Sequence, residues 1–196
     1  MMEGNIYQAP EAEIVVSQTE SKEFYVVAPS KFLLLFILTV GFYGLYWFYK
    51  NFDQYRKFNN ESLWPIPRAL FSIFFAHSLT NKINDRLEQQ KSNLFWSPGL
   101  YATLYVVFLI VDRVSARMAM RGVGEPWSDI VSLMTIFVIA AVLLPVQKAA
   151  NEACGDPKGE SNKSLTPANY AWLIVGSIYW LFIAFGTYVY YINPDF

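Results

Sequence analysis

Three polar side chains share the spacing of one helix face, because His77, Asn81 and Asp85 recur at every fourth position. A histidine oriented by a carboxylate can act as a general base, and the same groups can bind a metal ion weakly. A working site needs more converging groups than this stripe offers, whereas any amphipathic helix needs a polar face. We therefore interpret the stripe as a solvated helix face, with a membrane-surface enzyme using His77 and Asp85 as the alternative.

A second candidate group is basic and lies just beyond a long apolar run. Anionic lipid headgroups attract cations at a membrane surface by about 1 kcal/mol each. Membrane proteins also concentrate Lys and Arg on the cytoplasmic side as a rule of topology. We expect headgroup contacts that serve topology rather than regulation, from Lys50, Arg56, Lys57 and Arg68.

Other chemistry is scarce in the sequence. Cys154 is the only cysteine and His77 the only histidine, which excludes an internal disulfide, a thiolate metal cluster and a multi-histidine metal site within one chain. Phosphate-binding glycine loops and the common hydrolase motifs are absent. The sequence therefore predicts no catalytic residues, no metal and no cofactor, and its net charge of −1 gives no reason to expect nucleic acid as a partner.

The elements that would position these residues are set by four uncharged stretches. They cover Phe32–Tyr49, Ser92–Val111, Ile130–Gln147 and Ser164–Pro194 in a chain that is 54% apolar and 16% charged. As a helix, each can cross the roughly 30 Å of hydrocarbon in a bilayer. We predict an all-α integral membrane protein with spanning helices at about 32–49, 94–111, 130–146 and 170–192.

A fifth apolar run, Ala69–Asn81, is too short to span, at about 20 Å as a helix. Beyond Ala76 the pattern becomes amphipathic, with Leu79, Ile83 and Leu87 on one face and the polar stripe on another. We predict one amphipathic helix at 67–90, interfacial or re-entrant, in the first cytoplasmic loop. A fifth spanning helix is the alternative.

The distribution of Lys and Arg predicts orientation. Residues 1–31 read as a polar, acidic N-terminal tail and 32–196 as a single membrane domain. With four spans, the first and third loops carry ten Lys and Arg, against five on the other side. The positive-inside rule then places both termini on the non-cytoplasmic side, although Arg113, Arg117 and Arg121 in the second loop run against it.

The end of the first apolar stretch also carries a family resemblance. Residues Leu38–Asn51 read LTVGFYGLYWFYKN, with the order Phe42-Tyr43-Gly44 followed by Tyr46-Trp47 and a lysine. This pattern resembles the motif of small bacterial membrane proteins grouped as domain of unknown function 4234. The resemblance implies a bacterial inner membrane and no assigned activity.

Function is therefore predicted mainly from what the spans lack. None of the four carries an ionisable residue away from its ends, which disfavours ion or proton coupling. We expect a non-enzymatic accessory, assembly or scaffold protein that acts through helix contacts, with the lipid bilayer and a membrane-protein partner or a second copy as its partners. A small channel or facilitator formed by oligomers is the alternative.

Overall fold

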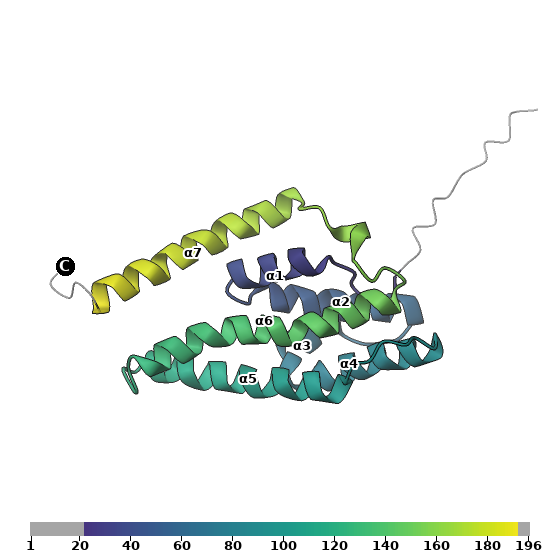
Figure 1. The fold of residues 1–196 in the computed structure, drawn as a ribbon, viewed down its shortest axis with the longest axis horizontal. Coiled ribbons are helices and arrows are strands. Elements are labelled where there is room, and N and C mark those ends of the chain that lie inside the picture. Colours follow the sequence, from purple (N-terminus) through teal and green to yellow (C-terminus); the bar gives the residue numbers. More distant parts are fainter. Residues whose placement is uncertain (1–21, 192–196) are drawn as a thin grey trace, which may run out of the picture.

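The computed structural model describes residues 22–191, and all regular structure in that part of the chain is helical (Figure 1). Proline is the first residue of four helices, where its fixed φ suits the first turn and its missing N–H costs nothing. The predicted all-α class is confirmed. The helices are α1 (Pro29–Leu38), α2 (Tyr43–Asn59), α3 (Pro65–Leu70), α4 (Ser72–Gln89), α5 (Pro98–Ala119), α6 (Trp127–Ala153) and α7 (Pro167–Tyr191), with the 3-10 turn η1 (Glu160–Asn162) before α7.

Three helices, α5, α6 and α7, are long and apolar enough to cross a membrane. They correspond to the stretches predicted at 94–111, 130–146 and 170–192. Helix α6 continues through Pro145 to Ala153, beyond the predicted end of its span. The extension carries two polar residues that are completely buried, Gln147 and Asn151.

The first predicted span, Phe32–Tyr49, is not one helix, and this part of the prediction is wrong. Helix α1 ends at Leu38 and α2 begins at Tyr43, while Val40 (φ 53°) and Gly41 (φ 81°) between them have left-handed backbone. A right-handed helix cannot continue through such residues. Among the described residues there are therefore three spanning-length helices instead of the predicted four, and α1 has only 10 residues.

The turn between α1 and α2 satisfies its own backbone. Every peptide N–H from residue 39 to residue 45 has an acceptor within the turn or in α1. The N–H of Gly41 bonds the carbonyl of Phe36 (2.9 Å), and the N–H of Tyr43 bonds Thr39 Oγ1 (2.9 Å). The Thr39 hydroxyl donates in turn to the carbonyl of Leu35 (2.7 Å). A turn paired in this way needs no water.

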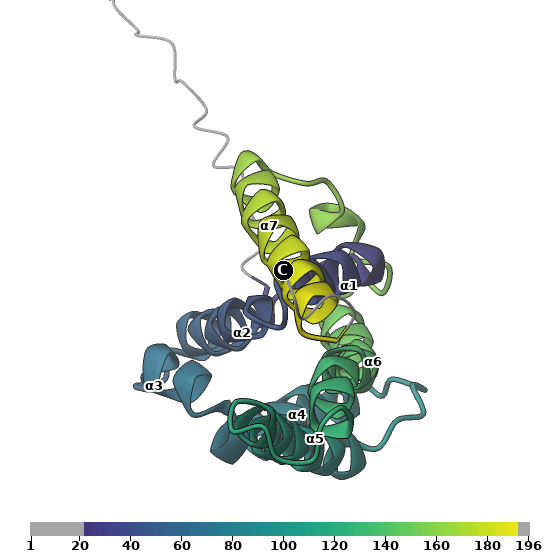
Figure 2. The same cartoon turned by 90° about the vertical axis from the view of Figure 1, so that its left-hand side faces the viewer.

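The helix predicted at 67–90 is also divided, because α3 ends at Leu70 and α4 begins at Ser72. The predicted apolar stripe is confirmed, since Leu79, Ile83 and Leu87 are all buried. They belong to the protein core instead of facing a bilayer, and α4 runs alongside α5 and α6 (Figures 1 and 2). An orientation flat in the membrane interface is therefore not supported for α4.

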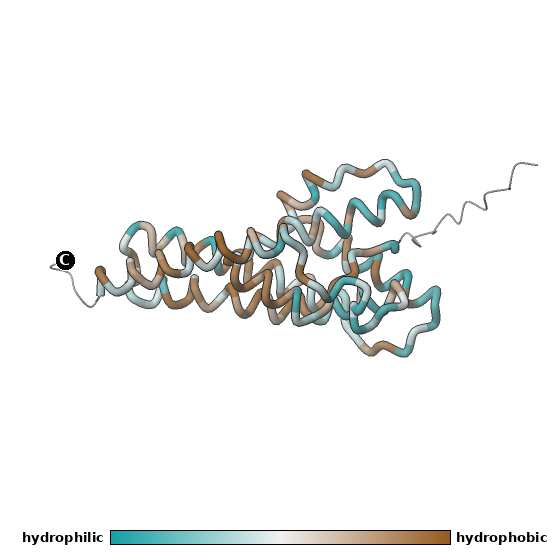
Figure 3. The backbone as a smooth tube through the Cα atoms, turned by 90° about the horizontal axis from the view of Figure 1, so that it is seen from above, coloured by the Kyte–Doolittle hydropathy of each residue, from teal (hydrophilic) through white to brown (hydrophobic). Residues whose placement is uncertain are grey.

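The molecule has one polar and one apolar part, as the hydropathy colouring shows (Figure 3). We call the polar part the head; it consists of the C-terminal parts of α2 and α4, the last residues of α6 and the segments 22–28 and 154–166. Lys22 lies in the head, where its Nζ contacts Asp156 Oδ2 at 3.1 Å. Tyr191 lies at the other end of the long helices, where its hydroxyl donates to Asp129 Oδ2 at 2.9 Å. The two ends of the described chain thus lie at opposite ends of the helices.

Candidate functional site

An extended segment, Glu23–Ala28, runs through the head and is part of the core. Phe24 and Val27 are completely buried, and the other four residues are at most 8% exposed. The sequence prediction placed these residues in a polar tail, and for residues 23–31 that prediction is wrong. Residues 29–31 begin α1, and residues 1–21 of the predicted tail lie outside the described residues.

The segment has no partner strand, and side-chain amides form the hydrogen bonds that a neighbouring strand would otherwise make with its backbone. Asn51 Oδ1 accepts the N–H of Tyr25 (3.1 Å), and Gln147 Nε2 donates to the carbonyl of Tyr25 (3.0 Å). Asn151 makes both bonds to one residue, accepting the N–H of Val27 (3.2 Å) and donating to its carbonyl (3.0 Å). Buried peptide groups need such partners, so these amides decide where the segment lies.

The amides also hold one another. Gln147 Nε2 donates to Asn151 Oδ1 (2.7 Å), and Gln147 Oε1 accepts the indole N–H of Trp47. Asn51 Nδ2 donates to the carbonyl of Trp47 (2.9 Å). Amide groups do not ionise and are poor nucleophiles, so this cluster specifies structure and has no catalytic group of its own.

Ion pairs fix the beginning of the segment. Glu23 contacts Arg86 of α4 (3.2 Å) and accepts a hydrogen bond from Asn59 of α2 (2.8 Å). Asp156 accepts hydrogen bonds from Lys22 Nζ (3.1 Å) and from two backbone N–H groups of η1. Burial by itself raises the pKa of the Asp156 carboxyl, but the hydrogen bonds from Ser161, Lys22 and Glu160 outweigh burial and hold that pKa well below its usual range.

The stripe His77, Asn81 and Asp85 lies on one exposed face of α4, as its spacing predicts. His77 Nε2 is hydrogen-bonded to Thr103 Oγ1 of α5 (3.1 Å). Eight residues of helix separate His77 from Asp85 by about 12 Å, too far for a direct hydrogen bond. In residues 22–191 no group of three or more His, Cys, Asp or Glu could hold a metal ion.

The four basic candidates have different surroundings. Arg56 and Lys57 both bond the buried carboxylate of Asp53 at 2.7 Å. Burial raises the pKa of Asp53, but the hydrogen bonds and charges of Lys57 and Arg56 outweigh burial and lower it. The remaining two stack on aromatic rings: Arg68 on Phe52 and Phe75, and Lys50 on Tyr25 at 6.0 Å.

Cys154 is a structural residue of the head. Its Sγ accepts the N–H of Phe24, within the extended segment, at 3.3 Å. Burial raises the pKa of the Cys154 thiol, which leaves less of the reactive thiolate at neutral pH. The geometry therefore gives no support to a reactive-thiol role.

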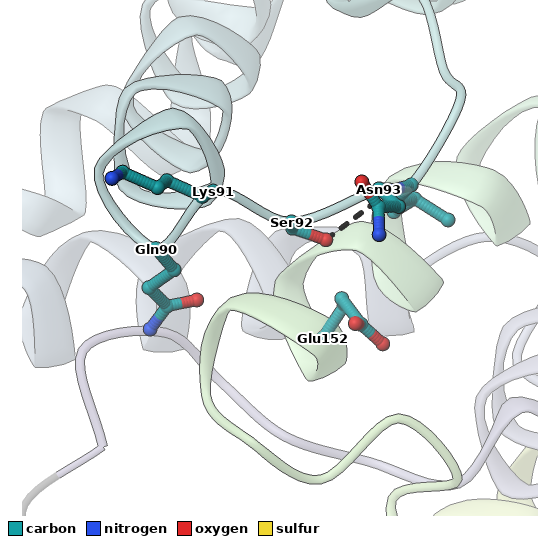
Figure 4. Close-up of a pocket in the computed structure, with 6 residues that line it drawn as sticks. Gln90, Lys91, Ser92, Asn93 and Glu152 are labelled. Carbon is teal, nitrogen blue, oxygen red and sulfur yellow. Dashed lines mark hydrogen bonds between the residues drawn. The ribbon is translucent and has the colours of Figure 1, made fainter.

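Two of the hollows at the borders of the head differ clearly in shape. Figure 4 shows an open one of about 470 Å³, where the loop after α4 passes Glu152 of α6. Lys91 points away from Glu152 in this view, and Ser92 Oγ accepts the N–H of Leu94 (3.2 Å). The other, of about 180 Å³, is more enclosed and apolar and lies between the α1–α2 turn and the start of α7.

Sequence reasoning missed the buried extended segment Glu23–Ala28, although the sequence contains features that are consistent with it. Phe24-Tyr25-Val26-Val27-Ala28 is a short apolar run rich in aromatic and β-branched residues, ending at Pro29. Gln147 and Asn151 follow an apolar helix at a spacing of four, so they share a face. Nothing in either pattern identifies the other as its partner.

Comparison with known proteins adds no family. No protein-family model, no curated protein and no solved structure matches this chain. The resemblance of Leu38–Asn51 to domain of unknown function 4234 therefore stays a prediction.

Proposed function

We propose that this is a multi-pass protein of a bacterial inner membrane that acts by binding another membrane protein, as an accessory, assembly or scaffold subunit, and not as an enzyme. The observation that supports this most is the position of α7. The backbone of α7 lies close to that of α1 alone, and α7 reaches α6 only through side chains, Trp180 against Phe137 and Tyr191 bonded to Asp129 (Figure 1). Of the 18 consecutive residues that form its most apolar part, only 6% are buried within the chain.

The attachment of α7 is narrow and specific. Gly176 packs directly on the backbone of Leu38, and Trp180 Nε1 donates to the carbonyl of Ile37 at 3.0 Å. Beyond these contacts, large side chains such as Leu181 and Phe182 are more than two-thirds exposed. A helix held along one line leaves its other faces open to a partner helix in the bilayer.

We further propose three spans, with α1 entering the membrane from the head side and the chain returning through α2. The contact between Gly176 and Leu38 places the α1–α2 turn about 13 Å along α7 from its first residue. Irregular backbone at such a depth is tolerated where its hydrogen bonds are satisfied by protein, as they are in this turn.

Charge supports a cytoplasmic head. Of the 15 Lys and Arg in the chain, Arg113, Arg117 and Arg121 lie near the far end of α5, and the others belong to the head or to elements that adjoin it, Arg68 being in α3. The distribution of Lys and Arg across the membrane is more uneven with three spans than with four. With three spans the first apolar stretch enters and leaves the membrane on the same side, so the basic residues before and after it lie together. The positive-inside rule then places Lys22 in the cytoplasm and Tyr191 on the other side, which revises the predicted side of the N-terminus.

Photo-crosslinking from α7 tests the contact function. A benzophenone amino acid at Phe182, on the open side of α7, should form one discrete adduct with a membrane protein in native membranes. The matched position is Val107 on α5, which is 46% exposed and should yield lipid adducts only. Mass spectrometry identifies the adduct, and the identified partner must co-purify with the unmodified chain.

Two results would contradict the proposal. Equal adduct patterns from Phe182 and Val107 would mean that α7 has no specific partner. Solute flux into proteoliposomes that contain only the purified protein would favour the small channel instead.

A further inference from the structure

The enclosed apolar cavity between the α1–α2 turn and α7 has the features of a lipid site. Its volume is about 180 Å³. Residues of α1, α2 and the turn between them form one wall, and the first turns of α7 with the residue before them form the other. The residues that line it include Leu35, Phe42, Tyr46, Thr166, Ala168 and Trp172.

The cavity begins at the depth of the first residues of α7 and extends inward to the α1–α2 turn. Its α7 wall consists of the first turns of a spanning-length helix, beginning next to Pro167. Phe42 is 65% exposed and Trp172 is 59% exposed, so both rings border the opening. Aromatic side chains collect at the headgroup level of a membrane, which matches this position.

Two cations lie on the head side of the cavity, and neither has a carboxylate within 4.0 Å among the described residues. Lys50 follows Tyr46 by one helical turn, and its ammonium lies over the ring of Tyr25, which packs edge-on against Tyr46. Lys31 precedes Leu35 by one turn.

Lys31 is buried and bonds only neutral oxygens. Its ammonium donates to Asn162 Oδ1 (2.8 Å) and to the carbonyl of Ser164 (2.7 Å), two residues before Thr166. An ammonium has three donors, so one remains beyond these two bonds. A buried cation without a counter-ion favours an anion nearby.

We propose that this cavity binds one anionic phospholipid, with part of an acyl chain between the α1–α2 turn and α7 and the phosphate next to Lys50 and Lys31. Ordinary ligand pockets measure about 300–1,000 Å³, so this cavity takes a chain segment and leaves the rest of the lipid in the bilayer. The proposal rests on the membrane placement proposed above.

Native mass spectrometry of the purified full-length protein tests the site by counting retained lipids. Phosphatidylglycerol and phosphatidylcholine with identical acyl chains are the probes. Ala168→Phe fills the cavity from an exposed position, and Ala171→Phe adds the same ring on α7 outside it. Wild type and Ala171→Phe should each retain one phosphatidylglycerol under conditions where Ala168→Phe retains none.

Charge is tested separately, in a variant that leaves the cavity intact. Lys50→Gln should reduce the preference for phosphatidylglycerol over phosphatidylcholine roughly fivefold, the effect of one cation near the surface. Lys158→Gln, at an exposed lysine of the loop before α7, should keep the wild-type preference.

Equal lipid retention by Ala168→Phe and Ala171→Phe would overturn the site, as would an unchanged preference in Lys50→Gln. Extraction of the protein from membranes by alkaline carbonate would instead overturn the membrane placement itself. The failures of the two proposals are thus distinguishable.

Discussion

The carboxamide of Asn151 forms two hydrogen bonds with a single residue, Val27, accepting its N–H at 3.2 Å and donating to its carbonyl at 3.0 Å. The two residues are 124 positions apart in the chain. One side chain of α6 thus does for the extended segment what a neighbouring β-strand would do in a sheet. The start of the described chain is thereby fixed to the end of a spanning-length helix.

Replacing Asn151 should destabilise the protein strongly. Asn151→Leu leaves the N–H and the carbonyl of Val27 buried without partners, and we expect a loss of about 3 kcal/mol. Asn84→Leu on the surface of α4 is the control and should change stability by less than about 0.5 kcal/mol. Thermal unfolding of both variants in detergent measures the difference, and equal effects would show that the amide pairing contributes nothing.

Two glycines of α7 should respond oppositely to alanine. A Cβ at Gly176 would lie 2.0 Å from the carbonyl oxygen of Leu38, whereas one at Gly186 meets nothing within 4 Å. Gly176→Ala should therefore lower the melting temperature by forcing α7 away from α1. Gly186→Ala should raise stability by about 1 kcal/mol through helix propensity alone. Similar gains in both variants would contradict the packing of α7 on the turn.

The turn between α1 and α2 can be tested by a reciprocal pair of substitutions. Val40 and Gly41 both have left-handed backbone, which glycine adopts more easily than other residues. Val40→Gly should therefore stabilise the folded protein and Gly41→Ala should destabilise it, each by about 1 kcal/mol. If Phe32–Tyr49 were one continuous helix, both signs would be reversed, because glycine weakens a helix interior and alanine strengthens it. Unfolding in detergent micelles gives both values.

The carboxylate of Asp156 should make stability depend on acid pH. Its pKa is lower in the folded protein than in the unfolded chain, so its contribution is complete above the unfolded pKa, about 4. The contribution is lost as the pH falls through the folded pKa. Asp156→Asn should cost about 2 kcal/mol at pH 7, and its difference from wild type should shrink below about pH 4.

The exposed carboxylate of Asp85 provides the control for this pH series. Asp85→Asn should have the same melting temperature as the wild type at pH 7. A difference between Asp156→Asn and wild type that stays constant from pH 7 to pH 3 would contradict the role assigned to Asp156.

Cysteine labelling should distinguish three spans from four. In a Cys154→Ser background, single cysteines replace Lys22, Asn60 and Val123. An impermeant maleimide added to right-side-out vesicles should label Val123→Cys only, and permeabilisation should expose the other two positions. With four spans, Lys22→Cys and Val123→Cys would label together from outside.

How far the sequence predicts this structure is clearest at three places. The spans in α5, α6 and α7 follow from length and hydropathy, which need no knowledge of neighbours. The exposed stripe His77, Asn81 and Asp85 and the buried stripe Leu79, Ile83 and Leu87 follow from helical periodicity. The break after Leu38 was missed, because Val40 gives no local signal for a turn and a single glycine such as Gly41 beside it is also common inside spanning helices.

The sequence by itself determined that the chain is helical and rich in membrane-compatible segments, since hydropathy and periodicity are local properties. Only the tertiary structure decided that the first apolar stretch turns back, at the place where Gly176 and Trp180 of α7 contact the last residues of α1. It also decided that Glu23–Ala28 belongs to the core, because the amides that pair its backbone lie far away in the chain. Neither segment by itself indicates that it pairs with the other, so this part of the fold could not be read from the sequence pattern.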